Sequence, residues 1–216
     1  MSRTLDPVSP DLLARLLALR GTGRKLIAVA GAPASGKSFL GGALCDALCR
    51  DGLRAELVPM DGFHLDNRIL DARGLRARKG APETFDVAGF IALIQRFRSE
   101  REVVYPIFDR AHDLSIAGAG VVAPSCDMVI IEGNYLLFDE HPWAALAGLW
   151  DFSIWLDTPE ETILQRCVAR WLAHGYDPEA ARIRAERNDL ANAHRIIAAR
   201  LPADVTLSEA DLKRVE

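Results

Sequence analysis

The residues Gly31-Ala32-Pro33-Ala34-Ser35-Gly36-Lys37-Ser38 fit the pattern G-x-x-x-x-G-K-[ST], a glycine-rich loop that binds phosphate groups. Residues 26–30 before the loop form an apolar run that is typical of a buried strand, and apolar residues recur at helical spacing after Ser38. A strand, a glycine loop and a helix in this order are the setting that the motif needs. The sequence therefore predicts a nucleotide-binding site at residues 31–38.

The residue types of this loop explain how it would hold phosphate groups. Gly31 and Gly36 let the backbone curl so that several N–H groups point into one concavity. The helix that follows adds the positive end of its dipole. Lys37 would supply a charge for the β- and γ-phosphates, and the Ser38 hydroxyl would ligate Mg²⁺. A chance glycine turn before a helix is the alternative interpretation of the same short pattern.

Polar residues follow three further predicted strands. Asp61 comes after a strand at residues 54–58, Asp109 and Arg110 come after one at residues 103–105, and Glu132 ends an apolar strand at residues 128–131. Strands that alternate with helices predict an α/β fold, with a parallel sheet covered on both faces. Because ligands bind beyond the carboxyl ends of such strands, we expect all three positions at the site.

The two acids could perform different steps of a phosphoryl transfer. Asp61 could accept the proton of a substrate hydroxyl as it attacks the γ-phosphate. Glu132 could hold Mg²⁺ through water, or orient a water near it. The alternatives are that Asp61 and Gly62 form an ordinary turn and that Glu132 is an ordinary carboxylate at the end of a strand.

Three arginines are candidates for neutralising charge on the transferred phosphoryl group: Arg110, Arg166 and Arg170. Arg166 and Arg170 lie four residues apart on a helix predicted at residues 159–174, so they share a face. A solvated helix face explains that pair equally well.

The acceptor site is less clearly marked. Residues 62–85 show little periodicity, and a loop of this length in a compact domain is usually functional. The candidates for lining a substrate pocket are His64, Asn67, Tyr105, Phe108 and Tyr135. A packing or turn role is equally open for each of them.

Composition limits the classes of function. The 216 residues suit one domain that spans residues 1–216, and half of them are apolar. The net charge of −4 gives no support for binding to nucleic acid or to a membrane surface. No apolar run approaches the ~18 residues of a membrane span, and the first residues lack the apolar core of a signal peptide. We therefore expect a cytoplasmic protein with a small-molecule partner, and the oligomeric state stays open, a homodimer included.

Together these motifs resemble a known family. The phosphate loop, PMDGFH at residues 59–64, RKGAPETFD at 78–86, FDR at 108–110 and IEGNY at 131–135 are similar to the P-loop kinases grouped with uridine kinase, pantothenate kinase and phosphoribulokinase. The combination is most similar to bacterial proteins named fructose-transport-system kinases or nucleoside kinase-like proteins. The resemblance extends from about residue 25 to residue 192.

The resemblance implies a five-stranded parallel sheet of order 2-3-1-4-5, ATP bound at the phosphate loop, Asp61 as general base and a helical lid whose arginines match the region of Arg166 and Arg170. We therefore expect ATP- and Mg²⁺-dependent phosphorylation of a hydroxyl group on a small metabolite, with a sugar such as fructose as one candidate. A nucleoside or pantothenate-type kinase is the alternative among enzymes. A regulatory NTPase that acts through a protein partner is the alternative of another class.

Overall fold

The computed structural model describes residues 8–212, which are built around a parallel sheet. The sheet has five strands in the order β2-β5-β1-β6-β7, and every neighbouring pair is parallel. Numbered along the chain within this sheet, that order is the predicted 2-3-1-4-5. The strands are β1 (Lys25–Gly31), β2 (Ala55–Pro59), β5 (Met128–Gly133), β6 (Phe152–Asp157) and β7 (Val205–Ser208).

Alternate residues of β1 face opposite sides of the sheet, as the pleat of a strand requires. Leu26 and Ala28 belong to the apolar cluster on one face, and Ile27 and Val29 belong to the cluster on the other. All four side chains are fully buried. Burial on both faces explains why residues 26–30 form an unbroken apolar run in the sequence.

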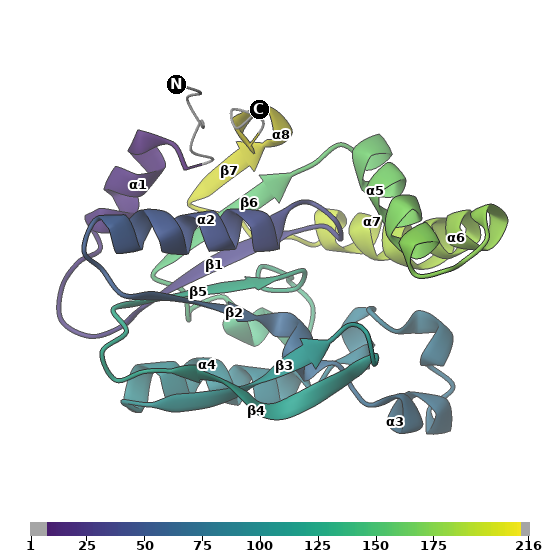
Figure 1. Cartoon of the computed structure of the whole chain (residues 1–216), viewed down its shortest axis with the longest axis horizontal. Helices are drawn as coiled ribbons and strands as arrows, with labels where there is room; N and C mark the ends of the chain where they lie inside the picture. Colours follow the sequence, from purple (N-terminus) through teal and green to yellow (C-terminus); the bar gives the residue numbers. More distant parts are fainter. Residues whose placement is uncertain (1–7, 213–216) are drawn as a thin grey trace.

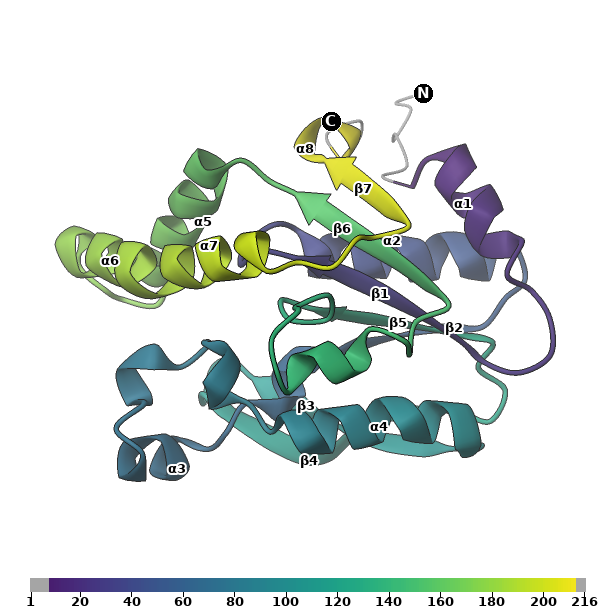
Figure 2. The ribbon, with the colours of Figure 1, turned by 180° about the vertical axis from the view of Figure 1, so that it is seen from behind.

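Two layers of helices cover the sheet (Figures 1 and 2). Helices α1 (Pro10–Leu17) and α2 (Lys37–Arg50) pack on one face, and α4 (Val87–Ser99) covers the other. None of the described helices is long and apolar enough to cross a membrane.

The remaining helices lie beyond the carboxyl ends of the strands (Figure 1). One group consists of α5 (Glu160–Ala173), α6 (Pro178–Arg184), a π-helical turn (Ala185–Leu190) and α7 (Ala191–Ala198), and it forms the predicted lid region. Helix α3 (Asn67–Ala72) lies across from this group. It belongs to residues 62–85, the segment whose sequence shows little periodicity. A last short helix, α8 (Glu209–Leu212), follows β7.

The prediction for residues 103–105 is wrong in one respect. The strand there, β3 (Val103–Asp109), lies outside the parallel sheet and pairs antiparallel with β4 (Leu114–Val122). A parallel neighbour needs a crossover of a dozen or more residues, and only residues 110–113 separate these strands. Asp109 and Arg110 therefore lie at the turn of a hairpin rather than at the carboxyl edge of the main sheet.

Candidate active site

The phosphate loop has the backbone of an anion cradle. Ala34 and Gly36 both have left-handed backbone conformations, with φ of 58° and 96°. Gly31 has no room for a side chain, because a Cβ there would lie 2.7 Å from Ser35 Oγ and 3.1 Å from Leu156 O. Helix α2 begins directly at Lys37, so its amino end faces the same concavity. These features fit the binding of phosphate groups by main-chain N–H donors.

Lys37 lies inside this cradle and is only 7% exposed. Its Nζ donates to Ala32 O at 2.7 Å and to Ser35 Oγ at 3.4 Å. Burial lowers the pKa of Lys37 to about 8, although the charges of Glu132 and Asp61 oppose this shift. The ammonium is thus held close to the loop, in surroundings that would favour an added negative charge.

Ser38 and Glu132 supply adjacent oxygens at the start of α2 and the end of β5. Ser38 Oγ donates to Glu132 Oε1 at 3.0 Å, and Glu132 is only 6% exposed. Burial, followed by the charge of Asp61, raises the pKa of Glu132. This donor set fits Mg²⁺, which takes one or two protein oxygens and completes its shell with phosphates and water. No cluster of three or more His, Cys, Asp or Glu that could hold a metal occurs within residues 8–212.

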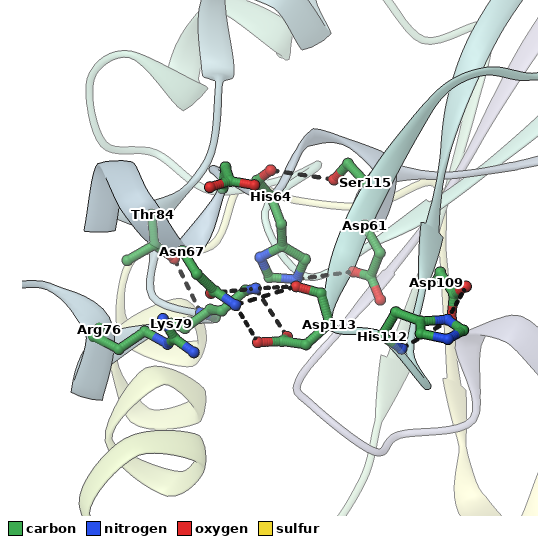
Figure 3. Close-up of polar contacts among 12 residues, drawn as sticks. Asp61, His64, Asn67, Arg76, Lys79, Thr84, Asp109, His112, Asp113 and Ser115 are labelled. Carbon is green, nitrogen blue, oxygen red and sulfur yellow. Dashed lines mark hydrogen bonds and ion pairs between the residues drawn. The ribbon is translucent and has the colours of Figure 1, made fainter. Parts of the chain in front are cut away.

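Asp61 follows β2 and points toward the hairpin turn (Figure 3). Its Oδ2 accepts a hydrogen bond from Arg110 Nη2 at 2.7 Å, and the Asp61 side chain is 25% exposed. The Asp61 carboxylate is close enough to oppose the fall in the pKa of Lys37 and to raise the pKa of Glu132. Because β5 lies between β2 and β1, Asp61 and the phosphate loop face each other across the end of Glu132's strand.

His64 packs between two aromatic rings beside Asp61. Its ring centroid lies 4.1 Å from that of Phe85 and 4.7 Å from that of Phe108. Burial lowers the pKa of His64 to about 4, so the imidazole is neutral at pH 7. Its Nε2 lies 3.9 Å from Asp61 Oδ1, while its buried Nδ1 has no hydrogen-bond partner in the described part of the chain. Among the predicted pocket residues, His64 and Phe108 line the cavity described below.

Asn67 belongs to a polar network that fixes the hairpin turn (Figure 3). Lys79 Nζ contacts Asn67 Oδ1 at 2.8 Å and Asp113 Oδ1 at 2.8 Å, and it also donates to Asp113 O at 2.9 Å. Asn67 Nδ2 donates to Asp113 Oδ2 at 2.8 Å. Asn67 itself is not among the residues that line the cavity. In the sequence, Lys79 appeared only within the RKGAPETFD motif at residues 78–86, and nothing indicated a role for Asp113.

The structure corrects the predictions for Tyr105 and Tyr135, because neither lines the cavity. Tyr105 is 3% exposed, and its hydroxyl lies 3.3 Å from both Glu56 Oε1 and Leu57 O. Tyr135 is fully buried, and its hydroxyl donates to Gly80 O at 2.5 Å. Burial raises the pKa of both phenols. Both are core residues, as the alternative interpretation held.

The two predicted lid arginines separate in the structure. Arg170 lines the cavity, and its Nη2 pairs with Asp189 Oδ1 at 2.9 Å. Arg166 lies one turn earlier on α5 and pairs with Glu209 at 2.8 Å, outside the cavity lining. Arg166 Nη1 also donates to Ala34 O of the phosphate loop, through one long, exposed hydrogen bond of 3.3 Å. The prediction that both side chains face the site is therefore corrected for Arg166.

One cavity of about 1050 Å³ joins these groups. Residues 33–38 and Glu132 line the part next to the phosphate loop. Asp61, His64 and Arg110 line a second part, and α5, α6 and the π-helical turn close it from the lid side. A volume at the upper end of the range for ligand sites suits two ligands that meet between the loop and Asp61. The arrangement can hold a phosphate chain at one end and present a carboxylate to a second molecule at the other.

Comparison with known proteins agrees with this geometry. The profile described as "Phosphoribulokinase / Uridine kinase family" matches residues 26–192. The fold also matches a crystal structure described as a "putative fructose transport system kinase" from Silicibacter sp. TM1040, with a TM-score of 0.88 and 54% identity. That match covers 91% of this chain and 97% of the other.

Two relatives extend the comparison. The chain is 34% identical to "Putative uridine kinase C227.14" of Schizosaccharomyces pombe, over 89% of this chain and 86% of the relative. It is 40% identical to the protein YggC of Escherichia coli over 66% of this chain, and the match spans only 59% of YggC.

Proposed function

The chain belongs to the Phosphoribulokinase / Uridine kinase family, and on that premise we propose that it transfers the γ-phosphate of ATP to a hydroxyl group of a small polar metabolite. One observation carries the proposal: the Asp61 carboxylate, held by Arg110, shares a cavity with Lys37 and with the Ser38–Glu132 pair. A phosphoryl transfer needs those two sets of groups on opposite sides of one phosphate.

In this proposal the phosphate loop and Lys37 bind the triphosphate. Bound MgATP supplies the transferable phosphoryl group and a cation that offsets charge on the phosphate oxygens. Ser38 and Glu132 would hold that cation. The Lys37 ammonium donates hydrogen bonds to Ala32 O and Ser35 Oγ. It can bind phosphate oxygens instead by giving up these two contacts. The negative charge of the triphosphate would also offset the free-energy cost of burying the Lys37 ammonium.

Asp61 would accept the proton from the attacking hydroxyl, and Arg110 would keep the carboxylate aimed at it. Arg170 would complement the charge that develops on the phosphoryl group, because it lines the cavity from the lid side. Closing of the lid would exclude water and so favour transfer to the acceptor over hydrolysis.

A sugar is the first candidate for the acceptor. The support is the printed name of the Silicibacter structure together with a wall of aromatic rings at Phe85 and Phe108, which suits the carbon face of a small polar molecule. A nucleoside is the second candidate, and its support is the printed name of the Schizosaccharomyces pombe relative.

The test is ADP formation by the full chain with MgATP and single members of a panel of sugars, sugar phosphates, hydroxy acids, nucleosides and pantothenate. We expect ADP to form only when one class of hydroxyl compound is present. Slow hydrolysis that ignores every small acceptor, together with a stable complex with a protein, would instead support a regulatory NTPase.

A further inference from the structure

Arg184 lies on the lid wall of the cavity and has no acidic partner among the described residues. Its Nη1 donates to Ala77 O at 3.3 Å, and its guanidinium carbon lies 4.5 Å from the centroid of the Trp171 ring. Its Nε is buried and makes no hydrogen bond within residues 8–212. Stacking on Trp171 fixes the plane of the guanidinium, while its charge is left without a counter-ion.

Arg76 lies close by on the facing wall. It precedes Ala77, the residue that Arg184 contacts, and Figure 3 shows it beside Lys79. It lines the cavity and pairs with Asp71 at 3.1 Å, with both side chains about half exposed at 49% and 58%. An exposed pair of this kind is weak and can be exchanged for a ligand.

Apart from Lys37 in the phosphate loop, the other cations that line this cavity already have carboxylate partners. Lys79 pairs with Asp113, Arg110 pairs with Asp61, and Arg170 pairs with Asp189. His64 adds no charge at pH 7. The charge of Arg184 is therefore uncompensated on the lid wall, and the exposed Arg76–Asp71 pair lines the same cavity, so a ligand that brings a negative group there gains most.

We propose that the phosphate acceptor carries an anionic group, a carboxylate or a phosphate, and that Arg184 and Arg76 bind it. This inference rests on the proposed kinase function and narrows its substrate class. Guanidinium groups offer paired N–H donors that match either anion. On this inference hydroxy acids and sugar phosphates are favoured over the neutral sugars and the nucleosides considered above.

The neighbours of Arg184 assign it to the acceptor rather than to the nucleotide. Through Ala77 it contacts the segment that leads to Lys79, which binds Asn67 and Asp113. Figure 3 shows this group next to His64, whose Nε2 lies 3.9 Å from Asp61 Oδ1. Arg170 is among the charges that lower the pKa of Lys37 in the phosphate loop. The lid thus presents one arginine to each half of the cavity.

The test saturates the full chain with Mg²⁺ and a non-hydrolysable ATP analogue, so that the phosphate loop is filled, and then titrates inorganic phosphate by calorimetry. We expect the loaded protein to bind phosphate. Arg184→Gln should weaken that binding at least about tenfold and leave the affinity for the analogue within about twofold. Arg76→Gln, on the other wall, should also weaken it. The matched control is Arg182→Gln, because Arg182 lies on α6 and its side chain is 71% exposed.

Three results would overturn the inference: no phosphate binding by the loaded protein, equal binding by the Arg184→Gln and Arg182→Gln variants, or a loss that affects the analogue and spares phosphate. If the analogue itself fails to bind, the kinase proposal fails separately. The same titration of the unloaded protein and the Arg184→Gln variant then still decides whether Arg184 binds an anion.

Discussion

Arg110 Nη2 lies 2.7 Å from Asp61 Oδ2, although 49 residues separate them in the sequence. The pair joins the turn of the β3–β4 hairpin to the end of β2. The same turn is held by Asp113, which contacts Lys79 and Asn67. The orientation of the proposed base therefore depends on a hairpin that is not part of the main sheet.

Removing Arg110 should reduce turnover because Asp61 loses the group that orients it. We expect Arg110→Met to lower kcat by at least about tenfold in the acceptor-dependent assay, and Arg110→Lys to restore part of it. Arg68→Met is the control, because Arg68 forms a similar pair with Asp66 at 2.9 Å and is 91% exposed. Equal kcat values for Arg110→Met and Arg68→Met would contradict this role.

Nucleotide binding should depend on the protonation of Lys37, whose pKa is about 8. The charged ammonium attracts phosphates, and its population falls as the pH rises above that value. Affinity for a non-hydrolysable ATP analogue should be flat below about pH 8 and fall about tenfold per pH unit above it. In Lys37→Arg the fall should vanish, because a guanidinium stays charged. Calorimetry across this pH range measures the affinity of the wild type and of Lys37→Arg for the analogue. A wild-type affinity that does not change with pH would contradict the proposed role of the Lys37 ammonium in nucleotide binding.

Glu132 should set the requirement for Mg²⁺. Replacing it by Gln keeps its size but removes the charge beside the Ser38 hydroxyl, which lies 3.0 Å away. We expect Glu132→Gln to raise the Mg²⁺ concentration for half-maximal activity by about 10- to 100-fold. Glu56→Gln is a control, because Glu56 contacts Tyr105 in the core rather than the cavity. An unchanged Mg²⁺ titration would exclude Glu132 from the cation site.

The two arginines of α5 should differ sharply in their effect on turnover. Arg170→Ala removes a cation from the cavity, and we expect kcat to fall roughly a hundredfold. Arg166→Ala should change kcat by less than about threefold, because Arg166 pairs with Glu209 outside the cavity. Steady-state kinetics of the two variants, with equal melting temperatures as a check on folding, measures the difference. A larger loss for Arg166→Ala would reverse the assignment.

The sequence predicted the parts of the site that depend on local pattern. Residues 31–38 carry the backbone and side chains of a phosphate loop, and the structure gives them that shape. The order of the sheet came from the resemblance to a family, because periodicity alone does not say which strands pair. Asp61 and Glu132 line one cavity because parallel strands bring their carboxyl ends to one edge.

Other parts depend on contacts between distant segments. Arg166 and Arg170 lie about 6 Å apart along α5. Arg166 nevertheless pairs with Glu209, whereas Arg170 lines the cavity. Helical spacing shows that the two share a face but not what that face meets. Asp113 gave no signal either, because its partners Lys79 and Asn67 lie 34 and 46 residues away in the sequence.

The most direct test of the central claim follows the labelled phosphate of γ-radiolabelled ATP with the wild type and with Asp61→Asn. We expect the wild type to place the label on an organic hydroxyl compound, and Asp61→Asn to do so about 10²- to 10⁴-fold more slowly while binding ATP normally. Asp46→Asn, an exposed change on α2, should behave as the wild type. Label found only in inorganic phosphate, at one rate in all three proteins, would contradict the assignment of the chain as a kinase with Asp61 as its base.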